Sequence, residues 1–512
     1  MILHDDRQTT GGGSSHAMLD GLFRQAAMRH ERAIALSDPP DRHRITSGLP
    51  HRLTYAEADN SVSAAAARLR ELGLQTDAIV AMQLPNTAEA IITLLGILRA
   101  GMIAALLPLL WRKADIVRAL SRINAKALIT CSRIGTTAHG EVAMQVAAEL
   151  FSIRHVCIFG DAPDGTVPLD DVFASAKIKT APPVTRSGNP ADHIAVITFD
   201  VAADGIVPVA RSHTQLIAGG LGPVLEGCIE ADATILTTTP IGSFAGVALS
   251  VMPWLLSGGT LALHHPFDLD SFSAQQRAFH CDAMVLPAAL LAPLADAGYL
   301  AGCHIKTILA LRRGPERLAD AIPTNETSLV DVVTFGESGL IATLREPHDG
   351  PLPLPVGKIS APRGHSGAVP IVEVARSKDG TLMLRGPMIP QSAFPPGAEQ
   401  RHEPHLNIRP DRFVDTGYGC ILASHGQSVT TTSPPAGIVG VGGYRFVMHG
   451  IEAIATKAVP NASVFAVPHA VLGQRLVGSS ADRAAAAVSL NDHGENPLVA
   501  DAFRPRGSSA AA

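Results

Sequence analysis

The sequence predicts an α/β protein: two parallel-sheet α/β lobes and a β subdomain form a large N-terminal domain, and a small, truncated α+β C-terminal domain follows. Three observations predict this fold. Strand-like apolar runs alternate with helix-like segments from residue 54 to 334, and Pro, Gly and short β-like runs dominate from residue 350. Of the 512 residues, only about 60 follow Glu452. At about 150 residues per domain, this length requires more than one core.

The first lobe begins with a helix whose start is marked by Thr54-Tyr-Ala-Glu57. This is a capping box, in which the Thr hydroxyl and the Glu carboxylate satisfy free backbone N–H groups. Apolar residues follow at helical spacing, and Gly73 marks the end. Asn86-Thr-Ala-Glu89 repeats the capping pattern for a second helix, which ends near Gly101. Strands are expected at 79–84, 102–107, 127–131 and 155–159, with helices at 115–123 and 141–153. Continuous apolar strands separated by helices predict a parallel sheet covered on both faces.

A second lobe with the same alternation follows a connecting loop at 160–192 that is rich in Pro, Asp and Gly. Its strands are expected at 193–199, 233–237, 260–264, 283–286, 307–311 and 329–334, and a long helix is expected to begin near Ser212. Runs at 352–356, 372–375 and 382–386 predict an antiparallel β subdomain. Pro434-Pro435 marks a boundary. We therefore expect an N-terminal domain over 17–436, with its β subdomain from about 350, a C-terminal domain over 437–506, and disordered tails at 1–16 and 507–512.

Composition excludes several classes of protein. The chain is 46% hydrophobic and 17% charged, which excludes a largely disordered chain. Its net charge of −5 argues against nucleic acid as a partner. The apolar stretch 91–110 carries Arg99 at its middle, so no membrane span is expected. The start has no apolar signal segment, and the six cysteines form no CxxC pair, so we expect reduced thiols and a cytoplasmic location.

Searches for general catalytic motifs are negative. The sequence contains no GxxxxGK[ST] phosphate loop, no HExxH and no GxSxG. His264-His265 and His402-Glu-Pro-His405 lack the spacing of a metal site on one helical face. The Gly-rich run 437–443 lacks the βαβ unit of a dinucleotide site, so it predicts a tight turn before a strand.

The order of several segments resembles the adenylate-forming acid ligases, which are the AMP-forming acyl-CoA synthetases with their luciferase and peptide-synthetase relatives. The resemblance rests on Leu53-Thr-Tyr-Ala-Glu57, Leu84-Pro-Asn-Thr87, Leu98-Arg-Ala-Gly101, the run 253–261 and His264-His-Pro-Phe-Asp268. It extends from about Ala17 to Val477. It implies ATP and Mg²⁺ as cofactors, a small carboxylic acid as substrate, and a thiol such as coenzyme A as acceptor.

Several motifs of that family are altered in this chain. The segment 198–213 corresponds to the Gly, Ser and Thr-rich loop that wraps the ATP phosphates, but it contains Asp200 and Asp204, and Val207 stands where the family has Lys. Two carboxylates facing a triphosphate would repel it in the absence of Mg²⁺. Gly336 replaces the Thr of the family's Thr-Glu motif, and Tyr418 replaces an Asp that holds the ribose hydroxyls. The family's C-terminal catalytic Lys has no counterpart, because the last lysine is Lys457.

The resemblance also implies a set of site residues. Glu337 is expected to be catalytic and to hold the magnesium ion. Thr198, Arg211, Thr416 and Gly417 are expected at the nucleotide, and Ser243, Phe244 and Gly246 at the acid, because 240–246 matches the family's acyl-site segment. Small Ser243 stands where the family has an aromatic residue or His.

The predicted function is therefore an AMP-forming acid ligase of fatty or aryl acid metabolism, with weak or altered activity. Two alternatives stay open. The first is a catalytically degenerate member of this family that binds an acyl group or a nucleotide, or acts as a regulatory protein. The second is a different nucleotide or acyl reaction that uses Asp200 and Asp204 as metal ligands. The sequence leaves the oligomeric state open.

Overall fold

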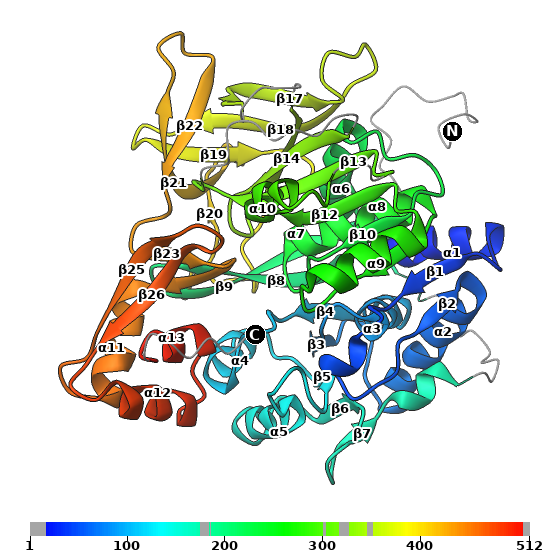
Figure 1. Ribbon diagram of the computed structural model, residues 1–512, viewed down its shortest axis with the longest axis horizontal. Coiled ribbons are helices and arrows are strands. Elements are labelled where there is room, and N and C mark those ends of the chain that lie inside the picture. Colours follow the sequence, from blue (N-terminus) through cyan, green and yellow to red (C-terminus); the bar gives the residue numbers. More distant parts are fainter. Residues whose placement is uncertain are drawn as a thin grey trace.

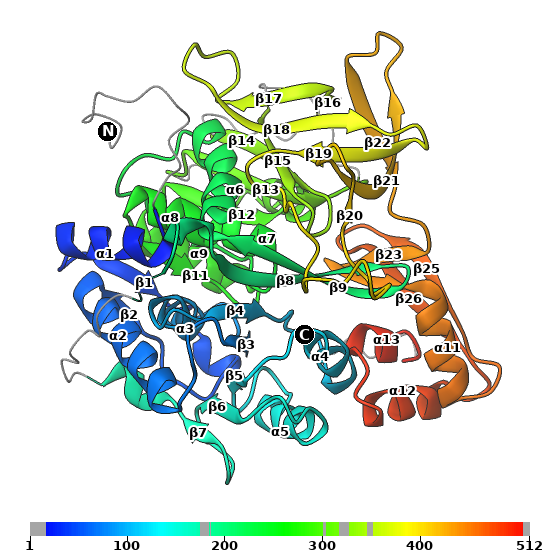
Figure 2. The ribbon, with the colours of Figure 1, turned by 180° about the vertical axis from the view of Figure 1, so that it is seen from behind.

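Two sheets share a layer of helices between them, as Figure 1 and Figure 2 show from opposite sides. The computed structural model describes residues 17–174, 184, 186–300, 304–316, 327–345 and 352–504, so the expected tails at 1–16 and 507–512 lie outside it. The first sheet has the strand order β7-β6-β5-β3-β4-β8-β9. Its strands are β3 (Ile79–Gln83), β4 (Ile103–Leu106), β5 (Ala127–Cys131), β6 (His155–Phe159), β7 (Val167–Pro168), β8 (Ile194–Ala202) and β9 (Gly205–Ser212).

The second sheet has the order β15-β14-β13-β12-β10-β11-β1-β2. Its strands are β1 (Ile34–Ser37), β2 (Arg52–Thr54), β10 (Ile235–Thr237), β11 (Leu261–Leu263), β12 (Ala283–Pro287), β13 (Thr307–Arg313), β14 (Ser328–Thr334) and β15 (Leu340–Leu344). Both interiors are parallel, which confirms the predicted α/β lobes. Antiparallel strands close the edges at β2, β9 and β15.

The helices form three layers around the two sheets. The shared layer contains α1 (Leu19–Arg29), α2 (Tyr55–Glu71), α3 (Ala88–Arg99), α6 (His213–Glu226) and α8 (Met252–Ser257), which join one core with the inner faces of both sheets. On the outer faces lie α4 (Lys113–Leu120) and α5 (His139–Glu149) on one side, and α9 (Leu269–Phe279) and α10 (Leu291–Asp296) on the other. Neighbouring strand residues alternate between cores, since Val80 faces the shared layer and Ala81 faces α4.

The β subdomain and the C-terminal lobe follow. The subdomain sheet runs β16-β22-β21-β19-β18-β17, with β20 beside β21. Its strands are β16 (Leu354–Pro355), β17 (Gly357–Ala361), β18 (Val369–Arg376), β19 (Thr381–Arg385), β20 (Asn407–Ile408), β21 (Val414–Leu422) and β22 (Ser428–Ser433). The C-terminal lobe contains β23 (Ile438–Val441), β24 (Tyr444–Val447), α11 (Met448–Ala458), β25 (Ser463–His469), β26 (Gly473–Ser479), α12 (Arg483–Asp492) and α13 (Pro497–Asp501). It has its own core and lies beside α4 in both views.

Polar contacts fix the C-terminal lobe on the first sheet. Arg118 of α4 pairs with Glu495 at 3.0 Å, and the Ala114 backbone N–H donates to the Gly494 carbonyl at 3.1 Å. Strand β24 lies against β8, and the Tyr444 hydroxyl accepts from the Leu110 backbone N–H at 3.1 Å. The hairpin formed by β23 and β24 is therefore held at the carboxyl edge of the first sheet.

The apolar stretch 91–110 is divided between α3, β4 and the loop after it. Arg99 is buried, and its guanidinium pairs with Asp20 and Asp59, each at 2.7 Å. Within the described residues, no helix is long and apolar enough to cross a membrane.

Helix α2 begins as predicted. Thr54 Oγ1 accepts from the Glu57 backbone N–H at 3.3 Å, and the Glu57 carboxylate accepts from the Thr54 N–H at 2.8 Å. The cap predicted for α3 is wrong, because the N-cap residue Thr87 makes no side-chain cap bond. Instead, the Ala88 N–H donates to Asp38 Oδ1 at 2.6 Å. The cap therefore comes from the loop after β1.

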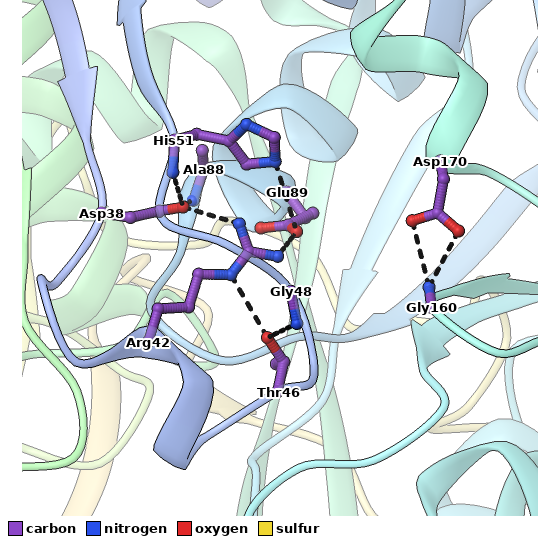
Figure 3. A network of polar contacts seen from close by, with 9 residues as sticks. All are labelled: Asp38, Arg42, Thr46, Gly48, His51, Ala88, Glu89, Gly160 and Asp170. Atoms are coloured by element: carbon purple, nitrogen blue, oxygen red, sulfur yellow. Dashed lines mark hydrogen bonds and ion pairs between the residues drawn. The ribbon is translucent and has the colours of Figure 1, made fainter.

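Asp38 belongs to a buried ion network, drawn in Figure 3. Arg42 pairs with Asp38 at 2.7 Å and also with Glu89, the second residue of α3. All three side chains are less than 5% exposed. His51, half-buried and stacked on Phe173, lies 4.0 Å from Glu89. One guanidinium thus joins two carboxylates at the start of the central helix α3.

Removing the Thr54 cap should destabilise the protein modestly. We expect Thr54→Ala to lower the free energy of unfolding by about 1 kcal/mol, because the Glu57 backbone N–H loses its side-chain acceptor. Urea unfolding followed by circular dichroism measures this difference. Thr54→Ser keeps the hydroxyl and should stay close to wild type; equal losses in both variants would show that the cap contributes nothing.

Candidate functional site

The carboxyl ends of strands from both sheets meet at one cavity. The loops after β4, β10 and β14 and the carboxyl-terminal part of β8 all contribute to its wall. In sheets of this kind, ligands bind beyond the carboxyl ends of the strands. The cavity has a volume of about 180 Å³, and Trp111 and Phe199 form an aromatic part of its wall with ring centroids 5.5 Å apart. Ser243, Glu337, Tyr444 and Arg445 also line it.

Glu337 lies in the turn between β14 and β15 and is 8% exposed. Its Oε2 accepts from the Phe244 backbone N–H at 2.8 Å. Burial, followed by the nearby Asp200 carboxylate, raises the pKa of Glu337, while nearby Thr198 and Arg211 oppose that shift. The structure thus places Glu337 and Ser243 on one cavity, with Thr198 directly behind the carboxylate.

Two of the predicted acid-site residues, Phe244 and Gly246, lie behind the residues that line the cavity. Phe244 is 1% exposed, and its ring stacks on the Arg211 guanidinium at 3.8 Å. Ser243 Oγ accepts from the Gly246 N–H at 3.2 Å, and a side chain at Gly246 would overlap the Pro240 carbonyl. Gly246 therefore allows the close turn that places Ser243.

Arg211 is 1% exposed and does not line the cavity. Its guanidinium donates to the backbone carbonyls of Glu337 and, at 3.1 Å, of Ser338. Burial lowers the pKa of Arg211 to about 10, although the carboxylates of Glu337 and Asp200 oppose this shift. In this structure the residue holds the turn that carries Glu337.

Thr416 and Gly417, predicted at the nucleotide, lie on β21. Thr416 Oγ1 donates to the Leu382 carbonyl at 2.8 Å. Gly417 adopts φ +71° and packs against Pro435. Neither residue lines the cavity, whereas the next residue, Tyr418, does.

The segment that resembles the phosphate loop folds as a β-hairpin. Strands β8 and β9 pair throughout, from Ile194 with Ser212 to Ala202 with Gly205, so a two-residue turn joins them. The ladder uses the backbone N–H groups that a phosphate-binding loop would leave free. Val207 pairs with Asp200 in this ladder and is 2% exposed. Asp204 is exposed in the turn, and Asp200 points toward Arg445, so the two carboxylates do not form a joint metal site.

Three departures from the family's motifs are in contact with one another. Asp200 accepts from the Glu337 backbone N–H at 2.8 Å and forms an ion pair with Arg445 of β24. Gly336 has φ +57°, and a side chain there would overlap both members of that pair. The Arg445 guanidinium lies 5.6 Å from the centre of the Tyr418 ring, and Tyr418 is hydrogen-bonded to the Gly336 backbone. Asp200, Gly336 and Tyr418 therefore form one unit around Arg445.

A larger cavity of about 730 Å³ adjoins the first. Arg313, Tyr418 and Arg445 line both cavities. Its remaining wall comes from the loop 314–316, the start of α10, and residues 468–474 of the C-terminal lobe. This volume is in the range of small-molecule sites, which is about 300–1,000 Å³.

Arg445, Arg313, Trp111 and Phe199 were not identified from the sequence. The run 437–443 predicts a tight turn before a strand, but only 442–443 form that turn, because Ile438–Val441 is the strand β23. Nothing in a single sequence indicates that this turn brings Arg445 to Asp200, because the contact depends on how the two lobes lie together.

The donor set fits magnesium at Glu337. Mg²⁺ prefers oxygen ligands and is commonly held by one or two carboxylates together with substrate phosphates. Glu337 supplies a carboxylate on the cavity surface, and the Thr239 hydroxyl is buried there with no hydrogen-bond partner. Among the described residues, no group of three His, Cys, Asp or Glu side chains could hold a metal without such phosphates.

Comparison with known proteins identifies relatives across most of the chain. The model of the AMP-binding enzyme family matches residues 23–344. Triostin synthetase I of Streptomyces triostinicus is 24% identical over 479 residues, which are 89% of this chain and 83% of that protein. The salicyl-AMP ligase / salicyl-S-ArCP synthetase of Mycobacterium tuberculosis is 29% identical over 248 residues, 48% of this chain and 42% of that protein.

Solved structures agree in fold. The amide bond synthetase McbA from Marinactinospora thermotolerans aligns with a TM-score of 0.72 and 18% identity, covering 93% of this chain and 94% of that one. The apo structure of Mycobacterium smegmatis MbtA aligns with a TM-score of 0.64 and 20% identity, covering 94% and 90%. At these identities, the likeness establishes the architecture alone.

Proposed function

We propose a function from the family of this chain, which belongs to the AMP-binding enzyme family of adenylate-forming acid ligases. The protein activates a small carboxylic acid with ATP and passes the acyl group to a thiol. Members of this family use ATP and act on small carboxylic acids. Coenzyme A is one candidate acceptor. The aromatic wall formed by Trp111 and Phe199 favours an apolar or aryl acid as the substrate.

One observation carries this proposal. The Glu337 carboxylate and the acyl-site segment meet in a single hydrogen bond, from the Phe244 N–H to Glu337 Oε2, at the wall of one cavity. A metal-binding carboxylate and an acid pocket are the two groups that adenylation must bring together. Arg211 holds the turn that carries this carboxylate, and Thr198 lies close to it, so we assign both residues positioning roles.

In the proposed reaction, a carboxylate oxygen of the substrate attacks the α-phosphorus of ATP, and the bond to the departing pyrophosphate breaks. Glu337 would hold Mg²⁺, which supplies charge neutralisation on the phosphates. Arg313 and Arg445 line both cavities and offer positive charge near the reacting groups. The larger cavity would take the base and ribose, with Tyr418 in its wall and Thr416 and Gly417 preceding Tyr418 on β21.

We expect low turnover. Val207 is buried in the hairpin and supplies no charge to a phosphate, and the last lysine, Lys457, lies on α11. Removing one electrostatic donor from an enzyme of this general kind lowers kcat by about 10²- to 10³-fold.

We also propose a cytoplasmic location, because Cys131, Cys157, Cys281 and Cys420 are buried free thiols, which suit a reducing compartment.

The Asp200–Arg445 ion pair favours a second candidate function, which is binding of an acyl compound or nucleotide without turnover. The pair places an anion at the wall of the cavity where a phosphate would have to lie. Arg445 is paired with Asp200, and a protein that only binds its ligand does not need this guanidinium to stabilise a transition state.

Exchange of labelled pyrophosphate into ATP separates the two functions. With ATP, Mg²⁺ and a panel of aliphatic and aryl acids, an acid-dependent exchange is expected for at least one acid. No exchange with any acid, together with ATP binding detected by calorimetry, would select the binding protein. Absence of both exchange and ATP binding would contradict adenylation and nucleotide binding at this site.

A further inference from the structure

The Asp200–Arg445 pair is the contact that brings a charged side chain of the C-terminal lobe into the cavity wall. Asp200 lies on β8 and Arg445 on β24, so the pair joins the two proposed domains. Both side chains are largely buried, 10% and 13% exposed respectively. Ion pairs shielded from water in this way are screened little by salt.

The surroundings are shaped to hold this pair. The second Asp200 oxygen accepts from the Glu337 N–H at 2.8 Å, which fixes the carboxylate beside the turn that carries Glu337. Gly336 leaves the space that the pair occupies, and Tyr418 lies against the guanidinium. A carboxylate that accepts charge-assisted hydrogen bonds presents the same kind of acceptor as a phosphate oxygen.

We propose that Asp200 occupies, on Arg445, the position that a ligand's phosphate would otherwise bind, and that this ion pair latches the C-terminal lobe over the cavity until an anionic ligand displaces it. This inference rests on the proposed function in one respect, namely that the ligand is a nucleotide. The closed state of the lobe rests on the contacts alone.

The latch has a consequence for ligand charge. A phosphate that enters must separate Arg445 from Asp200 and also lie near the Asp200 carboxylate, which repels it. Removing the charge of Asp200 should therefore favour phosphate-bearing ligands and leave uncharged nucleosides unaffected. A gain that arises from release of Arg445, rather than from lost repulsion, must disappear when Arg445 is also removed.

Calorimetric titration with AMP tests this. Asp200→Asn keeps the shape of the side chain and should bind AMP at least about tenfold more tightly than wild type, the size of one charge-assisted contact. Asp204→Asn, a matched change in the exposed turn of the same hairpin, should bind AMP as wild type does. The double variant Asp200→Asn/Arg445→Gln should lose the gain, and adenosine should bind wild type and Asp200→Asn equally. Unchanged AMP affinity in Asp200→Asn, or a gain retained in the double variant, would overturn the proposal.

Hydrogen exchange of the protein without ligand separates failure of the latch from failure of the proposed function. The backbone amides of Tyr444–Val447 should exchange faster in Asp200→Asn than in wild type or Asp204→Asn. If no variant binds AMP, nucleotide binding at this cavity is wrong, and the exchange rates alone decide the latch. Equal exchange rates in all three proteins would overturn it.

Discussion

Arg42→Met should lower the free energy of unfolding by about 3–5 kcal/mol, since it removes one partner of a buried ion network. Arg42 joins Asp38 and Glu89, both buried, and Asp38 also caps α3. Without the guanidinium, two carboxylates face each other away from water, and His51 is the nearest titratable group left to compensate. Urea unfolding measures the loss.

The loss should depend on pH in a defined direction. Burial, and then the charge of Glu89, raises the pKa of Asp38 from 3.8 to about 7. A carboxyl group whose pKa is higher in the folded state contributes stability that is present at low pH and is lost as pH rises toward the folded-state pKa. The deficit of Arg42→Met should therefore be larger at pH 8 than at pH 5, because lower pH lets Asp38 take up a proton.

Glu89→Gln is the matched control. It leaves Asp38 paired one to one with Arg42 and should cost much less than Arg42→Met, with a shallower change of stability between pH 5 and 8. Equal losses in the two variants, or an Arg42→Met deficit that does not change with pH, would contradict the role assigned to the network.

Glu337→Gln should reduce acid-dependent pyrophosphate exchange by about 10²- to 10³-fold, the usual effect of removing one electrostatic group from a reaction centre. The amide keeps an oxygen to accept the Phe244 N–H, so the turn should persist. It loses the negative charge that would hold Mg²⁺. The Mg²⁺ concentration for half-maximal exchange should rise, which a purely structural role of Glu337 would not cause.

Asp204→Asn serves as the control for Glu337→Gln, because Asp204 is exposed in the hairpin turn and contributes nothing to the cavity wall. Its exchange rate and Mg²⁺ dependence should match wild type. A Glu337→Gln enzyme with the wild-type Mg²⁺ dependence would remove Glu337 from the metal site.

Local sequence signals predicted much of the fold. The apolar runs at β5 and β6 and the capping box of α2 appear in the structure where they were expected, because their causes lie within a few residues of one another. The cap of α3 was assigned incorrectly because its acceptor, Asp38, is about fifty residues away in the chain. Sequence spacing alone cannot indicate such a partner.

The segment 198–213, which resembles a phosphate loop, contains a hairpin signal within its own sequence. Asp204-Gly205 is a hairpin signal, and Asp204 lies in the two-residue turn between the paired residues Ala202 and Gly205. The Asp200–Arg445 contact is different in kind, because it depends on the docking of two lobes and leaves no local trace.

An acyl-adenylate should form in the cavity at Glu337. The most direct measurement is mass spectrometry of a single-turnover mixture of protein, ATP, Mg²⁺ and the acid that gives the strongest exchange, quenched without thiol. Wild type should form an acyl-adenylate in amounts comparable to the protein, and Glu337→Gln should form none. No acyl-adenylate from wild type, although ATP binds, would contradict adenylation at this cavity.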